Sequence, residues 1–257
     1  MTDNDRLDYL INYLINERKD LEGLDIPNDQ TGKRKLLRSL MNVRMPDPIS
    51  EEFLKIQDEY LMEINREKGE VSVEEVTPIK EGIYLWQGDI TRLAADAIVN
   101  AANSQMLGCF IPCHGCIDNV IHSYAGVQLR LECAEIMERQ GHNEPVGGAK
   151  LTHAYNLPCK YVIHTVGPMI TGKLREKDCE LLASCYSSCF ELARIHGLKN
   201  IAFCCISTGE FRFPQQKAAE IAIDTVEKCR KDAKECPEVI FNVFKDSDYS
   251  IYRELLG

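Results

Sequence analysis

Apolar residues recur at the spacing of an amphipathic α-helix in three stretches near the start of the chain. Residues 5–18, 33–43 and 51–64 each place a leucine, isoleucine or aromatic side chain at about every third or fourth position, which is the period of one helix face. Ser50 stands where it can cap the third helix. Two prolines end the second helix, because proline disfavours helix at the residue before it. We predict a helical N-terminal extension, residues 1–75, and assign no chemistry to it.

The pattern then changes to short apolar runs that alternate with longer amphipathic stretches. Such runs are typical of buried strands, and the amphipathic stretches are typical of helices that cover a sheet. This alternation predicts an α/β domain over residues 76–257, with a mostly parallel sheet and helices on both faces. The predicted strands are residues 83–88, 97–102, 160–167, 200–207 and 238–244, and the predicted helices are residues 117–126, 126–141, 179–197 and 215–232.

Charge and hydropathy exclude some classes of partner. The chain has 40 acidic and 30 basic residues and a formal net charge of −10. Nucleic-acid binding depends mainly on clustered lysine and arginine, so we expect no nucleic-acid partner. The sequence has no apolar run of membrane-spanning length and begins with acidic residues rather than a basic signal-peptide region. We therefore expect no membrane partner and a cytoplasmic location.

Cysteine is concentrated in one part of the chain. All 12 cysteines lie between Cys109 and Cys236. Without an export signal, reduced thiols or metal ligands are favoured over disulfides. Most of these cysteines are expected to pack in the core, as Cys204 and Cys205 do within an apolar run.

Loops that follow the predicted strands carry the candidate chemistry, because ligands in such folds bind outside the carboxyl ends of the strands. Residues 87–91 read Gln-Gly-Asp-Ile-Thr; the aspartate fits either a turn or an acceptor for a base amino group. Asn100 and Asn103 flank two alanines, an arrangement that can bind sugar hydroxyls. Residues 207–214 combine hydroxyls, a glycine and backbone amides before a helix, which fits a diphosphate cradle or a well-capped turn.

The sharpest feature is a cluster of cysteines and a histidine after the second strand. Cys109, His114 and Cys116 form C-x4-H-x-C, and thiolates with imidazole are preferred zinc ligands. The cluster could also be cysteines in a loop with no metal at all. If a metal is bound, Cys113 leaves two alternatives open. Four protein ligands would make a closed, structural site, whereas three would leave a position for water or substrate, as catalytic sites do.

These motifs in this order resemble the macrodomain family. The resemblance rests on QGDIT, IVNAANS with MLG, IDNVIH and ISTGEFRFP, and covers about residues 81–257. It implies a three-layer α/β/α fold with a central mixed, mostly parallel sheet that binds ADP-ribose. Most macrodomains carry a run of glycines where this chain has CFIPCHGC, and that replacement is similar to the zinc-containing macrodomains of bacteria and some fungi. NVRMPDP and EEFLKIQDEYL in the helical extension also look like this subgroup.

The resemblance implies a role for individual residues. Asp89 holds the adenine amino group and Ile90 its backbone contacts, Asn103 binds the distal ribose, and Ile117 and Asp118 line the distal ribose and diphosphate. The residues implied to wrap the diphosphate are Ser207, Thr208, Gly209, Glu210 and Phe211.

The implied metal is zinc, held by Cys109, His114 and Cys116, with Cys113 as an extra thiol. Glu210 departs from the usual apolar residue at its position, and its charge is unfavourable beside a diphosphate unless the side chain turns outward.

The implied activity is zinc-dependent hydrolysis that releases mono-ADP-ribose from an O-linked ADP-ribosylated protein by cleaving a glycosidic or ester bond. In the bacterial subgroup this enzyme accompanies a sirtuin-like ADP-ribosyltransferase that acts on a lipoyl-carrier protein. Asn103 and Asp118 are the candidate catalytic residues, for fixing the sugar and for orienting the water or the distal ribose. The alternative is a non-catalytic reader of ADP-ribose with a structural zinc.

Overall fold

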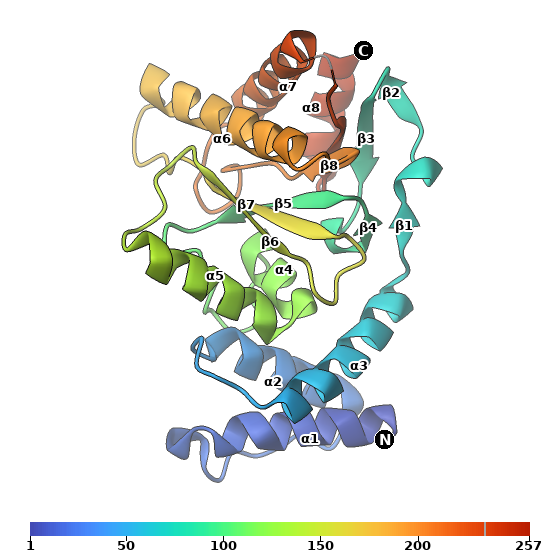
Figure 1. Ribbon diagram of the computed structural model, residues 1–257, viewed down its shortest axis with the longest axis vertical. Helices are drawn as coiled ribbons and strands as arrows, with labels where there is room; N and C mark the ends of the chain where they lie inside the picture. Colours follow the sequence, from blue (N-terminus) through green and yellow to red (C-terminus); the bar gives the residue numbers. More distant parts are fainter. Residues whose placement is uncertain (234) are drawn as a thin grey trace.

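Three N-terminal helices confirm the first part of the sequence pattern. The computed structural model describes residues 1–233 and 235–257. Helices α1 (Asp3–Asn16), α2 (Gln30–Val43) and α3 (Glu51–Lys68) form a layer at one end of the molecule, as Figure 1 shows. Ser50 caps α3 by accepting a hydrogen bond from the Phe53 N–H, which satisfies one of the unpaired donors of the first turn.

The rest of the chain is built on a seven-stranded mixed sheet in the order β2-β3-β9-β8-β5-β7-β6. The five inner strands run parallel, and the two edge strands, β2 and β6, pair antiparallel. The strands are β2 (Pro78–Lys80), β3 (Ile83–Gln87), β5 (Ala97–Ala102), β6 (Ala149–His153), β7 (Tyr161–Val166), β8 (Asn200–Phe203) and β9 (Glu238–Val243). A separate pair joins β1 (Val71–Ser72) to β4 (Leu93–Ala94).

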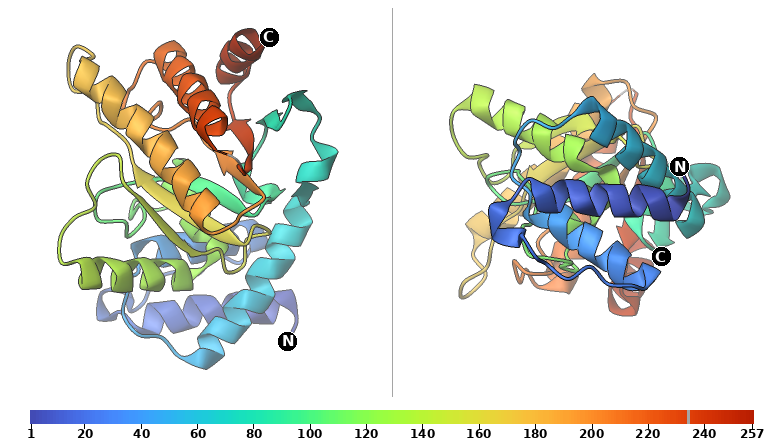
Figure 2. Two further views of the ribbon diagram at one scale, coloured as in Figure 1. Left: turned by 45° about the horizontal axis from the view of Figure 1, so that its top comes forward. Right: turned by 90° about the horizontal axis from the view of Figure 1, so that it is seen from below.

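Helices cover both faces of the sheet, as the sequence predicts. One face carries α6 (Glu176–Ile195), α7 (Gln215–Asp232) and α8 (Asp246–Leu256); the other carries α4 (Ile117–Ala125) and α5 (Val127–Gln140) (Figures 1 and 2). On that second face, α2 and α3 pack against α4. The N-terminal layer therefore reaches the sheet through α4.

Two hydrophobic clusters correspond to these two parts. The larger cluster lies between the sheet and its covering helices. The smaller one takes its buried side chains from α1, α2 and α3, together with Val127 at the start of α5. Burial of these apolar faces is the main contribution to the stability of both parts.

The structure corrects two details of the predicted elements. Strand β8 ends at Phe203, although the apolar run continues to residue 207, because the last four residues lie in a loop in which all but the partly buried Cys205 are buried. Helix α8 and the short strands β1, β2 and β4 were not predicted, since their apolar patterns are too short to stand out. None of the helices in the described part of the chain combines the length and apolar character that a membrane crossing needs.

Candidate functional site

The predicted site residues lie in loops at one edge of the sheet. Strands β3, β5, β8 and β9 are parallel, so the loops that follow them meet at the carboxyl edge. Asp89 follows β3, Asn103 follows β5, and the segment Ser207–Phe211 follows β8. Helix α4 begins at Ile117, at the end of the loop after β5. Side-chain contacts join Asn103 to Asp118 and His114 to Glu210.

Asp118 is a buried carboxylate held by two asparagines. Its side chain is 5% exposed and accepts hydrogen bonds from Asn100 Nδ2 at 2.8 Å and from Asn103 Nδ2 at 3.4 Å. Burial raises the pKa of Asp118 to about 6, although both asparagines favour the ionised form. The two amides of the Asn-Ala-Ala-Asn motif therefore fix the position of this carboxylate.

His164 in turn orients Asn100. The Asn100 Nδ2 lies 3.1 Å from His164 Nδ1, and Thr152 Oγ1 lies 2.9 Å from His164 Nε2. Burial lowers the pKa of His164 to about 3, so the ring is neutral. An acceptor Nδ1 and an Nε2–H donor satisfy both contacts. His164 is thus a core histidine with its hydrogen bonds satisfied.

His122 differs from the expectation for a satisfied core histidine. Its ring is buried, and neither ring nitrogen has a hydrogen-bond partner among the described residues. The nearest charged atom is Asp118 Oδ1, 3.6 Å from Nε2. Burial lowers the pKa of His122 well below its usual value, so it contributes a neutral ring beside the carboxylate.

Cys109, His114 and Cys116 converge in space. Their donor atoms all lie within 4.8 Å of one another, and Cys109 Sγ is 3.6 Å from His114 Nδ1. Two ligands of a tetrahedral zinc ion, one thiolate and one imidazole, are separated by about 3.6 Å when their bonds have ordinary lengths. The residues present therefore fit zinc, with three protein donors and one remaining position.

The protonation chemistry of Cys116 agrees with this fit. Burial and the neighbouring Cys109 thiol raise the pKa of Cys116 to about 12. Two thiolates at this distance need a cation to balance their charge. Cys116 also caps α4, since its Sγ accepts from the Asn119 N–H at 3.4 Å.

Cys113 turns away from the other three donors. Its φ of +52° places it in the left-handed region, and its Sγ lies 3.1 Å from Ser39 Oγ on α2. This geometry favours the three-ligand alternative over the closed four-ligand site.

The loop after β8 offers free backbone donors. Ser207 has a φ of +66°, and the turn is closed by the Phe213 N–H donating to the Ser207 carbonyl at 2.9 Å. Within residues 1–233 and 235–257, no acceptor is present for the N–H groups of Gly209, Glu210 and Phe211. Such successive amides form an anion site. Phe213 packs inward, whereas Phe211 is half-buried.

Glu210 faces the metal cluster rather than the interior of the loop. Its side chain is 73% exposed, and its Oε1 lies 3.7 Å from His114 Nε2. Because His114 Nδ1 faces Cys109, the two ring nitrogens have different neighbours. A carboxylate beside the outer nitrogen of a metal-binding histidine helps to orient the ring, which accounts for an acidic residue at this place.

Asp89 is paired with a residue that the sequence analysis did not single out. Lys68, at the end of α3, lies 2.8 Å from Asp89 Oδ2, while Asp89 Oδ1 accepts from the Thr91 N–H at 3.0 Å. Burial opposes ionisation of Asp89, but Lys68 and Thr91 outweigh it and lower the pKa. Asp89 therefore caps its turn and keeps its charge.

Phe244 is a second residue that the sequence analysis missed. It directly follows β9 and is 74% exposed. The Gly88 N–H donates to the Val243 carbonyl at 2.9 Å, so Phe244 adjoins the turn that holds Asp89. The sequence did contain a signal for Phe244, because it is an aromatic residue at the carboxyl end of a predicted strand. Its place in the apolar run 238–244 made it look like a buried strand residue instead.

Comparison with known proteins decides the family. A family model described as "Macro domain" matches residues 99–222. The "Protein-ADP-ribose hydrolase" of Treponema medium is 54% identical to this chain, and the alignment covers 100% of both. The chain belongs to the macro domain family.

Other members extend this comparison. The Trypanosoma brucei macrodomain solved in complex with ADP-ribose has a TM-score of 0.67 and 30% identity, over 85% of this chain and 95% of that one. A Fusarium oxysporum protein, "Probable bifunctional ADP-ribose hydrolase/ADP-ribosyltransferase", is 40% identical over 89% of this chain and 42% of its own length. The macro domain match includes the whole cysteine and histidine cluster, whereas α1, α2 and α3 lie outside it.

Proposed function

We propose that this macro domain protein is a zinc-dependent hydrolase that removes mono-ADP-ribose from O-linked ADP-ribosylated protein. The observation that carries the proposal is the position of the metal cluster. Cys116 caps α4, and Asp118 lies in the first turn of the same helix. The candidate zinc ligands and the candidate catalytic carboxylate are therefore fixed to one another by a single turn of helix.

We place ADP-ribose along the carboxyl edge of the sheet. Asp89 and Ile90 receive the adenine, and Asn103, Ile117 and Asp118 receive the distal ribose. We assign the diphosphate to the free N–H groups of the Ser207–Phe211 loop and to the N-terminus of α4. Both kinds of donor favour an anionic group. The order of the loops along the edge supports this placement.

The reaction that we propose is a hydrolysis. A water oxygen forms the new bond either to the anomeric carbon, in which case the acceptor oxygen leaves with the bonding pair, or to the ester carbonyl carbon, in which case the anomeric oxygen of the ribose leaves with it. In both cases the leaving oxygen takes up the proton that the attacking water loses. Asp118 orients the water or the distal ribose, and Asn103 fixes the sugar for attack. Zinc, which Cys109, His114 and Cys116 would hold, would supply a Lewis acid for this reaction.

The proposed substrate is supported by a relative whose name combines removal and attachment of ADP-ribose. The Fusarium relative is described as both hydrolase and transferase. We therefore propose that this chain reverses an ADP-ribosyltransferase of the sirtuin-like type, with a lipoyl-carrier protein as the modified partner. The two separate hydrophobic clusters support a division into an extension, residues 1–75, and a macro domain, residues 76–257.

Release of ADP-ribose distinguishes the proposed enzyme from a reader. The purified protein is incubated with a protein carrying O-linked mono-ADP-ribose, and free ADP-ribose and residual modified protein are measured. We expect one free ADP-ribose for each modified protein that is consumed, and many modified proteins consumed for each enzyme molecule. Binding of the modified protein without release would support instead a reader module whose zinc is structural.

We predict that Phe244→Ala weakens ADP-ribose binding about ten-fold, because an aromatic ring that stacks on a base contributes on the order of 1–3 kcal/mol. Isothermal titration calorimetry with ADP-ribose measures the effect. Phe244→Tyr keeps the ring and is the matched control, with affinity near that of the wild type. Equal affinity of the alanine variant would place the adenine elsewhere.

A further inference from the structure

Helix α2 contacts the loop that carries the candidate zinc ligands, which we define as the metal loop, residues 109–116. Arg38 Nη2 donates to the backbone carbonyl of His114 at 2.8 Å and to Asn119 Oδ1 at 2.8 Å. The Arg38 Nε also donates to Ser123 Oγ at 3.2 Å. One guanidinium therefore fastens a metal ligand's backbone to two residues of α4.

Asn119 extends this contact to the rest of the metal loop. Its oxygen faces Arg38, so its Nδ2 points the other way and donates to the carbonyls of Cys109 at 3.2 Å and Ile111 at 2.9 Å. Because the Arg38 guanidinium needs an acceptor, its hydrogen bond turns Asn119 Oδ1 toward Arg38 and Asn119 Nδ2 toward the metal loop. Two of the three ligand residues, Cys109 and His114, are held through this network.

Asn42 makes a second, independent contact one turn further along α2. It is 1% exposed; its Oδ1 accepts from the Cys113 N–H at 2.9 Å, and its Nδ2 donates to Ser123 Oγ at 2.9 Å. Cys113 has the left-handed φ of +52° that turns the chain just before His114. A non-glycine residue keeps such a backbone only where its surroundings impose it.

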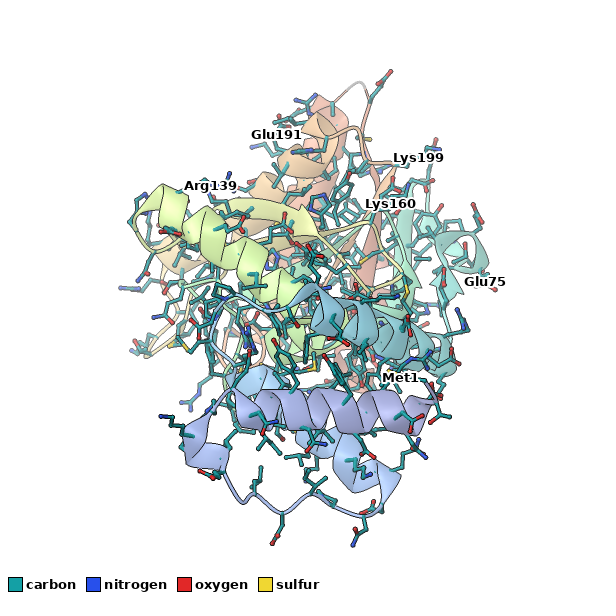
Figure 3. All side chains as sticks on the ribbon, turned by 60° about the horizontal axis from the view of Figure 1, so that its bottom comes forward. Met1, Glu75, Arg139, Lys160, Glu191 and Lys199 are labelled. Atoms are coloured by element: carbon teal, nitrogen blue, oxygen red, sulfur yellow. The ribbon has the colours of Figure 1, made fainter. Side chains whose placement is uncertain are left out.

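Arg130 also connects the end of α2 to Leu107, two residues before the metal loop begins. The buried Arg130 donates to the carbonyl of Met41, in the last turn of α2, at 2.9 Å and to the carbonyl of Leu107 at 2.6 Å. Carbonyls in the last turn of a helix have no partner within the helix, so the guanidinium satisfies them. Figure 3 views the molecule from this end, with α1 in front and side chains between it, α3 and α5.

We infer that α2 is a positioning helix for the zinc site, with Arg38 and Asn42 as its positioning residues. They hold the metal loop, which has no helix or strand of its own, in the conformation that brings its three donors together. Ordering a free loop costs conformational entropy for each residue that is fixed, and a loop held in advance avoids part of that cost when the ion binds. The inference rests on the zinc site of the proposed function.

Zinc affinity of folded variants tests this inference without reference to turnover. Arg38→Ala and Asn42→Ala are titrated with zinc in competition with a chromophoric chelator of known affinity. We expect affinity 10- to 100-fold below that of the wild type, the range typical of lost outer contacts to metal ligands. The cobalt(II)-loaded variants should keep the thiolate charge-transfer band, because both cysteines and the histidine remain.

Arg34→Ala is the matched control on the same helix. Arg34 pairs with Glu67 of α3 at 3.0 Å and, among the described residues, has no hydrogen bond or ion pair to the metal loop. The zinc affinity of Arg34→Ala should therefore equal that of the wild type. Denaturant unfolding in the presence of chelator verifies that each variant is folded without metal. Should Arg38→Ala or Asn42→Ala fail to fold, Arg38→Lys and Asn42→Asp are used, since each keeps part of the hydrogen bonding and should weaken zinc binding less.

The outcomes separate the inference from the proposed function. Unchanged zinc affinity in the Arg38 and Asn42 variants, or an equal loss in Arg34→Ala, would overturn the positioning role of α2 while leaving the zinc site intact. A wild-type protein that binds no zinc would overturn the proposed function itself.

Discussion

Cys116→Ala is expected to leave a folded protein that has lost its zinc and its hydrolase activity but still binds ADP-ribose in part. Cys116 supplies one of three donors that lie within 4.8 Å of one another, and two remaining donors hold zinc much more weakly. The proposed adenine position at Asp89 and the Ser207–Phe211 part of the proposed diphosphate position lie on other loops, so binding of ADP-ribose should be reduced rather than abolished. We expect metal content below a tenth of an ion per chain and turnover reduced by about 100-fold or more.

Metal content by plasma emission spectrometry, ADP-ribose release and ADP-ribose affinity are measured on the same preparation. Cys113→Ala is the matched control, because its thiol faces Ser39 on α2; it should keep zinc and turnover. Loss of zinc from both variants would indicate the closed four-ligand site, and full activity of the metal-free variant would refute any role for zinc in turnover.

Asp118→Ala is expected to lower kcat by about 10²- to 10⁴-fold, the usual contribution of a positioned acid–base group. The carboxylate is buried, is held by Asn100 and Asn103, and lies one turn from the metal cluster. Because no metal-cluster donor atom is removed, the variant should retain one zinc ion per chain. Single-turnover release of ADP-ribose from modified protein separates this loss from weaker binding.

Asp178→Ala provides a control for the removal of a buried carboxylate from the first turn of a helix. Asp178 is 3% exposed and lies at the start of α6, where it pairs with Arg175 at 2.7 Å. This variant should keep wild-type kcat even if its thermal stability falls. An Asp118→Ala protein with kcat within three-fold of the wild type would remove Asp118 from the mechanism.

The helices and strands that the sequence predicted are those with long, regular apolar patterns. Helix α7 and strand β5 begin and end as their apolar patterns indicate. The spacing between the apolar residues that an element buries shows whether it is a helix or a strand. Strand β8 was predicted too long, since burial in a loop leaves the same apolar signature as burial in a strand. Strand β8 ends at Phe203, and the apolar run continues through the following loop without any change in hydrophobicity.

The amino-acid sequence by itself determined the chemistry of the donors: two thiols and an imidazole at a spacing that suits zinc, and loops that follow parallel strands. Only the tertiary structure decided which donors converge, because the direction of Cys113 depends on Ser39 and Asn42, more than seventy residues earlier in the chain. It also decided the pairing of Asp89 with Lys68 and the use of α2 against the metal loop. Such contacts join segments whose relative placement follows from packing of the whole chain, and no local pattern records it.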